Sequence, residues 1–251
     1  METKRYINEK DMTWLASESI SEEDEPDIED YNDRFEGWRI APYSLDTVLT
    51  DYPHIWIADG HKLAGYQYCS GGNSNGFVFV IPDYQELPPP PIEGLEFGWL
   101  ESGEVSLSEK SILPEWASPD VGKFLKGDKT SLSYLEASHC LRALHEMGAR
   151  WHGLYWSTHT LITSEKLATD VLSRHEKGRY EAADWKWPQG KPSEWRPCVL
   201  NECNGTVVVV FYTFSELGRE TVYLHQDTYT KNYESQSKNT IVGTGADGII
   251  F

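Results

Sequence analysis

Ten residues in the middle of the chain, from 151 to 160, combine aromatic rings with imidazole, phenol and hydroxyl groups. An apolar pocket that holds a few convergent polar groups needs this mixture. It predicts a hydrolase site with two groups of candidates: binding residues Trp151 and Trp156, and catalytic residues His152, Tyr155 and His159. Alternation along an extended segment would put Ser157 and His159 on one side, although no G-x-S-x-G pattern surrounds the serine. The alternative is a set of core aromatics whose polar tips are hydrogen-bonded.

Three further candidates for the same site, Glu202, His225 and Asp227, lie on predicted strands nearer the C-terminal end. His225 and Asp227 are two residues apart and so share one face of a strand. There, a carboxylate can orient an imidazole as a base or a ligand. Ordinary alternation favours the other interpretation, in which the pair faces solvent on the polar side of a sheet.

Metal and cofactor patterns are incomplete. His145 and Glu146 begin like the helix of a zinc protease, but that motif needs a second histidine four residues after the first, and position 149 is alanine. Cys198 and Cys203 are separated by four residues, which lies outside the usual short spacing of zinc ligands. We therefore expect no metal and no cofactor.

Three indoles, those of Trp185, Trp187 and Trp195, lie in a polar segment from 184 to 197 that contains Pro and Gly. Loops lie at the surface, where indoles are costly to expose unless they fold back on the core or contact a partner. Because aromatic residues anchor many interfaces, the three are candidate binding residues. They suit a protein partner, or the ligand of a sugar- or nucleotide-binding module. The alternative is a lid of tryptophans packed over a sheet.

The charge is strongly negative and unevenly distributed. The 251 residues include 22 basic and 40 acidic side chains, a net charge of −18, which argues against binding nucleic acid through counterion release. Half of this charge lies between residues 18 and 36, where Arg34 is the one basic residue. The centre of this block contributes four candidate binding residues: Glu22, Glu23, Asp24 and Glu25. Such a block is typical of a solvated arm or of a segment that binds a basic partner.

The composition, 39% hydrophobic and 25% charged, excludes collagen-like, coiled-coil and wholly disordered classes. The longest apolar run, from 207 to 212, is far shorter than the roughly 20 residues of a membrane-spanning helix. The first residues contain no apolar region typical of a secretory signal. We therefore expect a cytoplasmic protein that needs no membrane and whose four cysteines are free thiols.

Together these patterns favour a soluble, acidic binding protein that engages a basic protein partner, for example as its inhibitor or neutraliser. A hydrolase with a pocket around 151–159 and a sugar- or nucleotide-binding module are the alternatives. Whether the protein is an enzyme, and its oligomeric state, stay open at this point.

The four prolines at 88–91 divide the chain, because consecutive prolines favour polyproline II and cannot donate to a sheet ladder. We predict an acidic segment at 1–37, a β-rich lobe at 38–87, a connector at 88–91 and an α+β lobe at 92–251. The alternative is that the two lobes form one continuous domain.

Hydrophobic spacing and turn signals place the elements. Strands are predicted over 54–58, 62–68 and 77–81, with the first two joined across Asp59-Gly60. Short helices are predicted over 45–49 and 118–126, and another from 164 to 175. Three strands over 198–203, 206–214 and 221–227 form a predicted antiparallel meander, with a turn at Asn204-Gly205. Strands, then helices, then strands indicate the α+β class.

The strongest predicted helix starts at a capping box, Ser133 to Glu136, and ends before Gly148. Its apolar stripe predicts the buried side. His139, Arg142 and Glu146 share the opposite side, which we expect to be a solvated, charged face.

Overall fold

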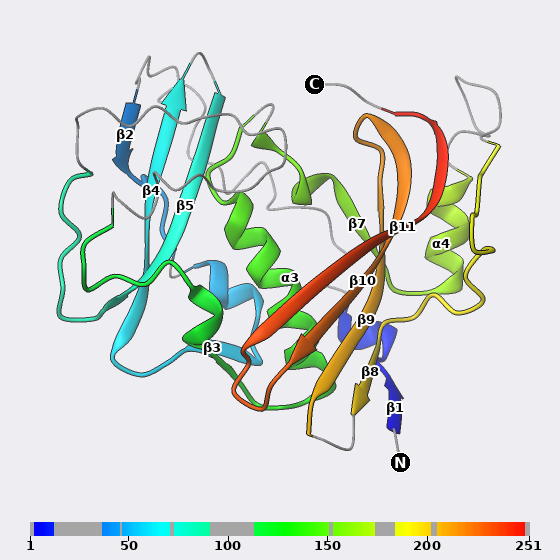
Figure 1. The fold of residues 1–251 in the computed structure, drawn as a ribbon, viewed down its shortest axis with the longest axis horizontal. Helices are drawn as coiled ribbons and strands as arrows, with labels where there is room; N and C mark the ends of the chain where they lie inside the picture. Colours follow the sequence, from blue (N-terminus) through cyan, green and yellow to red (C-terminus); the bar gives the residue numbers. More distant parts are fainter. Residues whose placement is uncertain are drawn as a thin grey trace.

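The computed structural model describes residues 3–12, 37–45, 47–70, 73–90, 113–150, 153–173, 184–201 and 205–248. Within these ranges the protein is an α+β structure in which antiparallel sheets predominate (Figure 1). The described residues therefore support the α+β part of the predicted fold class. None of the helices in the described ranges is long and apolar enough to cross a membrane.

The larger sheet has six antiparallel strands in the order β1-β8-β9-β10-β11, with β7 paired to β9. Its six strands have these bounds: β1 Thr3–Tyr6, β7 His159–Ile162, β8 Cys198–Asn201, β9 Val207–Ser215, β10 Arg219–Tyr229 and β11 Ser235–Asp247. One side of β9 pairs with β10 along its length, and β8 and β7 share the other side. β8, β9 and β10 are neighbours, but the sheet is larger than the predicted three-strand meander. Strands from distant parts of the chain complete it.

A smaller sheet in the order β2-β4-β5 and a two-stranded pair, β3-β6, contain the remaining strands of the described ranges. The bounds are β2 Gly37–Ile40, β3 Ile55–Ile57, β4 His61–Ser70, β5 Asn73–Pro82 and β6 Leu125–Gly127. The predicted strands over 54–58, 62–68 and 77–81 correspond to β3, β4 and β5. However, β3 pairs with β6 and not with the strand that follows the turn at Asp59-Gly60.

Helix α3 (Ser131–Glu146) lies between the smaller and the larger sheet (Figure 1). Its buried apolar side chains belong to a core cluster that also contains residues of β4 and β5 and the alternate residues Val207, Val209 and Phe211 of β9. The cluster therefore includes residues from both sides of the proline run. The predicted division into lobes stays a prediction, as does the role of the connector, because residues 91–112 lie outside the described residues.

The opposite face of the larger sheet is covered by α4 (Glu165–Leu172) and by the tryptophan segment (Figure 1). Val171 of α4, Phe214 of β9 and Trp195 are all buried in one second cluster. Ser164 caps α4, since its side chain accepts a hydrogen bond from the N–H of Leu167.

Two of the predicted short helices are wrong. The first is a 3-10 turn, η2 (Val48–Asp51), and the second is a 3-10 turn, η3 (Val121–Lys123), followed at once by β6. The other 3-10 turns of the described residues are η1 (Glu9–Met12) and η5 (Trp156–Thr158). The capping residues correctly predicted that the chain turns at these two places. Each segment has too few apolar residues to pack a longer helix against the core.

The predicted start of the long helix is also wrong. The helix begins at Ser131, and Thr130 is its N-cap, because Thr130 Oγ1 accepts the N–H of Ser133 at 3.1 Å. Ser133 and Glu136 therefore lie inside the helix and make contacts other than a capping box. The helix ends as predicted, before Gly148, which has a positive φ of 78°.

Candidate functional site

Five of the predicted site residues lie close together on the face of the larger sheet that α3 covers. Tyr155 and Trp156 belong to η5 and its cap, His159 begins β7, and His225 and Asp227 lie on β10. Ring centroids are 4.9 Å apart for Tyr155 and His159, 5.1 Å for Trp156 and His159, and 5.6 Å for Trp156 and His225. The segment is a 3-10 turn followed by a strand, so the alternation expected for an extended 151–160 does not apply.

The other predicted site residues divide into two groups. The first lies outside the described residues: Trp151, His152, Glu202, Glu22, Glu23, Asp24 and Glu25. The second consists of the three tryptophans, which lie on the opposite face of the larger sheet from the histidines. The structure therefore does not bring the tryptophan segment and the 153–160 residues into one site.

His225 and Asp227 do not face solvent. Their exposed fractions are 2% and 0%, so the solvent-facing interpretation is wrong, because α3 packs over this face of β10. The expected solvated face of α3 is wrong for the same reason. Arg142 donates from Nη1 to Asp227 Oδ2 at 2.6 Å and from Nη2 to Asp227 Oδ1 at 2.8 Å. This two-point geometry is the strong form of an Arg–carboxylate pair.

The third member of that helix face, Glu146, also has a structural role. Its carboxylate accepts the backbone N–H groups of Tyr155 and Ser157 and the hydroxyl of Ser157, each at 2.7 Å. Glu146 thus fixes η5, and with it Trp156, against the end of α3. His139 contacts the same turn through an edge-on ring contact with Trp156 at 5.3 Å, and its Nδ1 lies 2.8 Å from the hydroxyl of Tyr52, which follows η2.

A chain of hydrogen bonds, which we call the central cluster, starts at the Arg142–Asp227 pair and runs across the sheet. It contains these residues: Arg142, Asp227, Asn239, His225, Thr213 and His159. Arg142 Nη2 donates to Asn239 Oδ1 at 3.1 Å, and His225 Nδ1 lies 2.8 Å from the same oxygen. Thr213 Oγ1 lies 2.7 Å from His225 Nε2 and 2.8 Å from His159 Nδ1.

The direction of each bond in this chain follows from Arg142. Arg142 can only donate, so the Asn239 oxygen is an acceptor and His225 Nδ1 must donate to it. Neutral His225 then accepts the Thr213 hydroxyl proton at Nε2, and Thr213 Oγ1 accepts the Nδ1–H of His159. His159 Nε2 is therefore left as a lone-pair acceptor. It is buried and has no hydrogen-bond partner among the described residues.

The histidines of this region are neutral at pH 7. Burial, together with the charges of His225 and Arg142, lowers the pKa of His159 to about 3. Burial and Arg142 lower the pKa of His225 and of His139 to about 4. A general base works best when its pKa is near the operating pH, so these imidazoles are suited to accepting hydrogen bonds and poorly suited to proton transfer.

The tryptophan segment is a packed lid. Trp195 is fully buried, so it is not the surface anchor that the sequence allowed. Trp185 and Trp187 stack with centroids 5.3 Å apart, and Trp187 meets Trp195 edge-on at 6.1 Å. Lys186 between them pairs with Thr244 of β11 through two backbone hydrogen bonds. The segment thus follows the alternative interpretation, in which the indoles fold back over the sheet.

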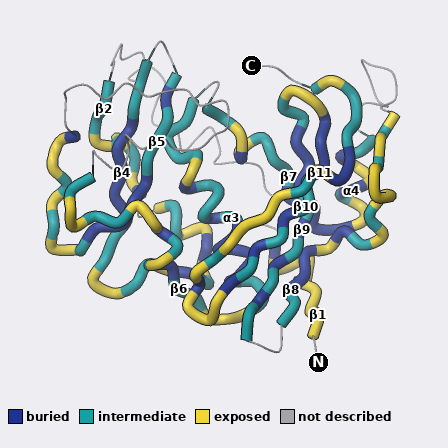
Figure 2. Tube along the Cα trace, viewed as in Figure 1, coloured by how far each residue is buried: buried dark blue, intermediate teal, exposed yellow. Residues whose placement is uncertain are grey.

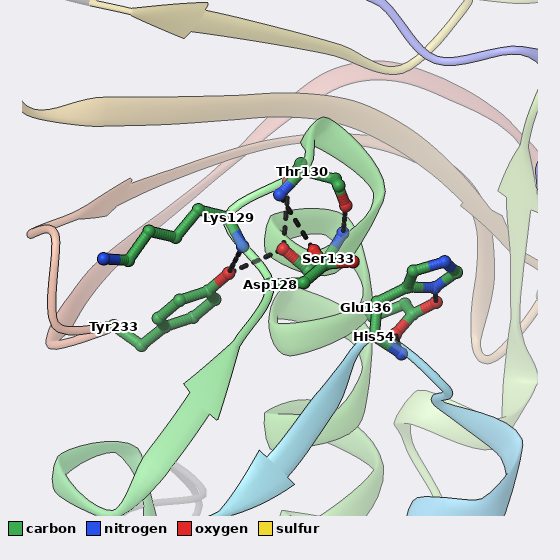
Figure 3. Close-up of polar contacts among 7 residues, drawn as sticks. All are labelled: His54, Asp128, Lys129, Thr130, Ser133, Glu136 and Tyr233. Atoms are coloured by element: carbon green, nitrogen blue, oxygen red, sulfur yellow. Dashed lines mark hydrogen bonds and ion pairs between the residues drawn. The ribbon is translucent and has the colours of Figure 1, made fainter.

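Sequence reasoning missed a second polar group, the N-terminal cluster, at the start of α3 (Figure 3). Its members are His54, Asp128, Lys129, Thr130, Ser133, Glu136 and Tyr233. Glu136 is fully buried, and its two carboxylate oxygens accept the ring Nδ1–H of His54 at 2.6 Å and the backbone N–H of His54 at 2.9 Å. The capping-box pattern had assigned Glu136 to the helix end, and no local pattern marks His54.

Backbone strain also gathers in the N-terminal cluster. Lys129 and Tyr233 are the non-glycine residues of the described ranges with positive φ, 65° and 68°, and they contact each other. The N–H of Lys129 donates to Tyr233 Oη at 3.0 Å, and Ser133 Oγ lies 2.6 Å from the same oxygen. Strained positions persist where surrounding contacts fix them, and here Tyr233 supplies those contacts.

A cavity of about 360 Å³ opens beside α3, and Arg142 and Asn239 of the central cluster contribute to its lining. Four elements line it: α3 from Leu141 to His145, β5 from Gly76 to Val78, the turn at 119–122, and β11 at Ser235, Ser237 and Asn239. Its volume lies in the range of ligand pockets. Within the described part of the chain, no group of three or more His, Cys, Asp or Glu residues is placed to hold a metal.

The acidic surplus is not a property of the described residues. They contain 17 basic and 20 acidic side chains, so they carry −3 of the net charge of −18. The remaining −15 belongs to the residues outside these ranges, among them the block from 18 to 36.

No protein family, no curated protein and no solved structure matches this chain.

Proposed function

We propose that this protein is an acidic, cytoplasmic binding protein that engages a basic protein partner through the segment from 18 to 36. The observation that carries the proposal is the charge distribution: half of the net charge of −18 lies in the segment from 18 to 36. A concentrated charge steers a complementary partner and selects against like-charged proteins. Inhibition or neutralisation of a basic enzyme is one form that such binding takes.

The geometry around His159 supports binding more than hydrolysis. A hydrolase site around 151–159 needs a base that takes up a proton near pH 7, whereas the three buried imidazoles of this region have pKa values of about 3 to 4. The indoles of the tryptophan segment stack on one another and on the core, which gives less support to a sugar- or nucleotide-binding module.

The test is capture of partners from a native lysate at low and at high salt, with two charge-matched variants. One variant neutralises the block at Glu22→Gln, Glu23→Gln, Asp24→Asn and Glu25→Gln. The control removes the same charge from exposed residues elsewhere: Glu9→Gln, Asp11→Asn, Glu165→Gln and Asp170→Asn.

We expect a basic protein to bind the wild type at low salt and to be released at high salt. The block variant should retain about tenfold less of it, and the control variant should behave like the wild type. Equal retention by the two variants would contradict a role for the segment from 18 to 36.

A further inference from the structure

The cavity beside α3 has a strand edge on each of two walls. β11 is the last strand of the larger sheet, and β5 is an outer strand of the smaller sheet. Both contribute residues to the cavity lining. Figure 1 shows α3 between them, and Figure 2 shows a run of exposed residues along β11.

The register of β11 shows which of its backbone groups point away from β10. Thr230 N–H donates to Glu234 O in the connecting turn, and the pairing is regular from Tyr229↔Ser235 to Tyr223↔Ile241. Hydrogen-bonded and non-hydrogen-bonded pairs alternate along an antiparallel ladder. The N–H and C=O groups of four residues therefore point away from the sheet: Ser235, Ser237, Asn239 and Ile241. No hydrogen bond joins these groups to another described residue.

The backbone groups of β5 that point away from β4 follow the same alternation. Ser74 O accepts the N–H of Arg150, and Val80 exchanges two backbone hydrogen bonds with Ser118. The regular pairing of β5 with β4 means that Gly76 and Val78, which lie between them, also point outward. Both line the cavity, and no hydrogen bond joins their outward backbone groups to another described residue. Strand edges on two walls of one cavity form a template for an added strand.

The edges of the larger sheet at β1 and at β11 differ in protection. β1 is short, with four exposed residues that include Lys4 and Arg5, and both features discourage pairing with another chain. β11 has 13 residues, and before its irregularity near Ile241 it carries a single charge, on Lys238. Its polar side chains keep it soluble without blocking the backbone groups of the edge.

The cavity floor and its charge define the chemistry of an occupant. Leu141 and Leu144 of α3 supply an apolar floor. Arg142 is balanced by Asp227, and burial with the nearby Arg142 lowers the pKa of His145, which leaves that ring neutral. The remaining charge of the lining is the exposed carboxylate of Asp120. Its 3.1 Å ion pair with Lys123 joins two exposed side chains and so contributes little.

We propose that an extended segment of a basic partner adds to the edge of β11 as an antiparallel strand between residues 235 and 241. Its alternate apolar side chains lie over Leu141 and Leu144, and a basic side chain lies near Asp120. Main-chain hydrogen bonds supply the affinity in this mode, and the alternate side chains supply the specificity. This inference rests on the proposed function and names the contact that accompanies the acidic segment.

The first test uses a synthetic heptapeptide of alternating lysine and valine as the probe, with the full-length protein. In the free protein, the amides of Ser237, Asn239 and Ile241 should exchange with solvent rapidly, and saturating peptide should protect them. An alternating glutamate–valine peptide and a lysine–valine peptide with methylated alternate amides are the controls. Slow exchange in the free protein, or equal binding of the methylated peptide, would overturn the proposal.

The second test blocks the edge of β11 itself. Ser237→Pro removes an N–H that β10 does not use, and edge strands tolerate proline at such positions. Ser237→Ala is the matched control. We expect the proline variant to bind the probe about tenfold more weakly, as for the loss of one or two hydrogen bonds, and the alanine variant to bind like the wild type. Binding that is unchanged by proline would overturn the edge contact.

The two proposals fail separately. If the edge contact is wrong and the acidic segment is right, the lysate partner still depends on residues 22–25 but is insensitive to Ser237→Pro. If the acidic segment is wrong, neutralising it leaves that partner in place, and the methylated peptide still reports on the β11 edge.

Discussion

Helix α3 contributes to two polar clusters, and in each an imidazole has a different charged neighbour. In the N-terminal cluster, His54 contacts the buried carboxylate of Glu136. In the central cluster, His159 and His225 lie near the guanidinium of Arg142, and Asp227 holds that guanidinium in place. A buried acid and a buried base within one structure therefore respond to pH in opposite directions.

The signs follow from the pKa shifts. Burial raises the pKa of Glu136, and contacts with His54 only partly offset this. A group with a raised pKa contributes stability at low pH, which is lost as the pH rises through its folded pKa. The histidines of the central cluster have lowered pKa values, so their contribution is complete at high pH and is lost as the pH falls below about 6.5.

The largest expected effect is that of removing the anion from the central cluster. Asp227→Ala should lower the free energy of unfolding by about 3–5 kcal/mol, because it leaves the guanidinium of Arg142 buried without a counter-charge. Urea denaturation measures the change. Asp170→Ala on the exposed side of α4 is the control and should change stability by less than about 0.5 kcal/mol. Equal losses in both variants would show that the buried pair does not hold α3 on the sheet.

The second effect is the response of the wild type to mild acid. Between pH 6.5 and 5.5 the free energy of unfolding should fall by about 1 kcal/mol for each of three histidines, or by about 3 kcal/mol in all. The three are His139, His159 and His225. The unfolded chain takes up protons over this range, whereas the folded imidazoles, with pKa values of about 3 to 4, do not. Urea denaturation at the two pH values measures the difference. A flat response would mean that these rings are solvated in the folded protein.

The third effect separates charge from hydrogen bonding in the N-terminal cluster. Glu136→Ala should lower the free energy of unfolding by about 1–3 kcal/mol, because the partly buried N–H of His54 loses its acceptor. Glu136→Gln should cost less, since the amide oxygen still accepts that hydrogen bond. Thermal unfolding of both variants at pH 7 tests this order. If glutamine proves as costly as alanine, the N-terminal cluster depends on charge in the way the central cluster does.

The smallest effect concerns strain at the same end of α3. Lys129→Gly should raise the free energy of unfolding by up to about 1 kcal/mol, because glycine adopts a positive φ without the cost of a Cβ. Lys126→Gly in strand β6 is the matched control and should lower stability, since glycine weakens a strand. Chemical denaturation of the pair distinguishes local strain from a general effect of losing a lysine.

The sequence was most informative where a pattern depends on one element alone. The apolar stripe of α3 and the apolar run of β9 both depend on local sequence, and each predicted an element that exists. The predicted turn at Asn204-Gly205 lies partly outside the described residues. Local spacing does not show which other element packs over a helix or a strand. Arg142, His225 and Asp227 have the spacing of solvated residues, and only the packing of α3 on β10 makes them interior.

The candidate sites show the same limit more strongly. Tyr155, Trp156 and His159 were identified because they are close in sequence. Two residues, Thr213 and Asn239, connect His159 to Arg142. They lie on strands far along the chain, and no sequence motif identifies them. Glu136 was assigned to a capping box because its spacing from Ser133 fits that motif. In the structure Thr130 is the N-cap, and the carboxylate of Glu136 contacts His54 instead.

The pairing of β1 with β8 has a consequence for synthesis. Thr3–Tyr6 forms its ladder with Cys198–Asn201, so during synthesis β1 has no partner in the sheet until nearly two hundred further residues have been added. At about 5–20 residues per second, that interval is on the order of 10–40 s. During this time the charges of Lys4 and Arg5, which are exposed in the folded protein, discourage the unpaired strand from pairing with another chain.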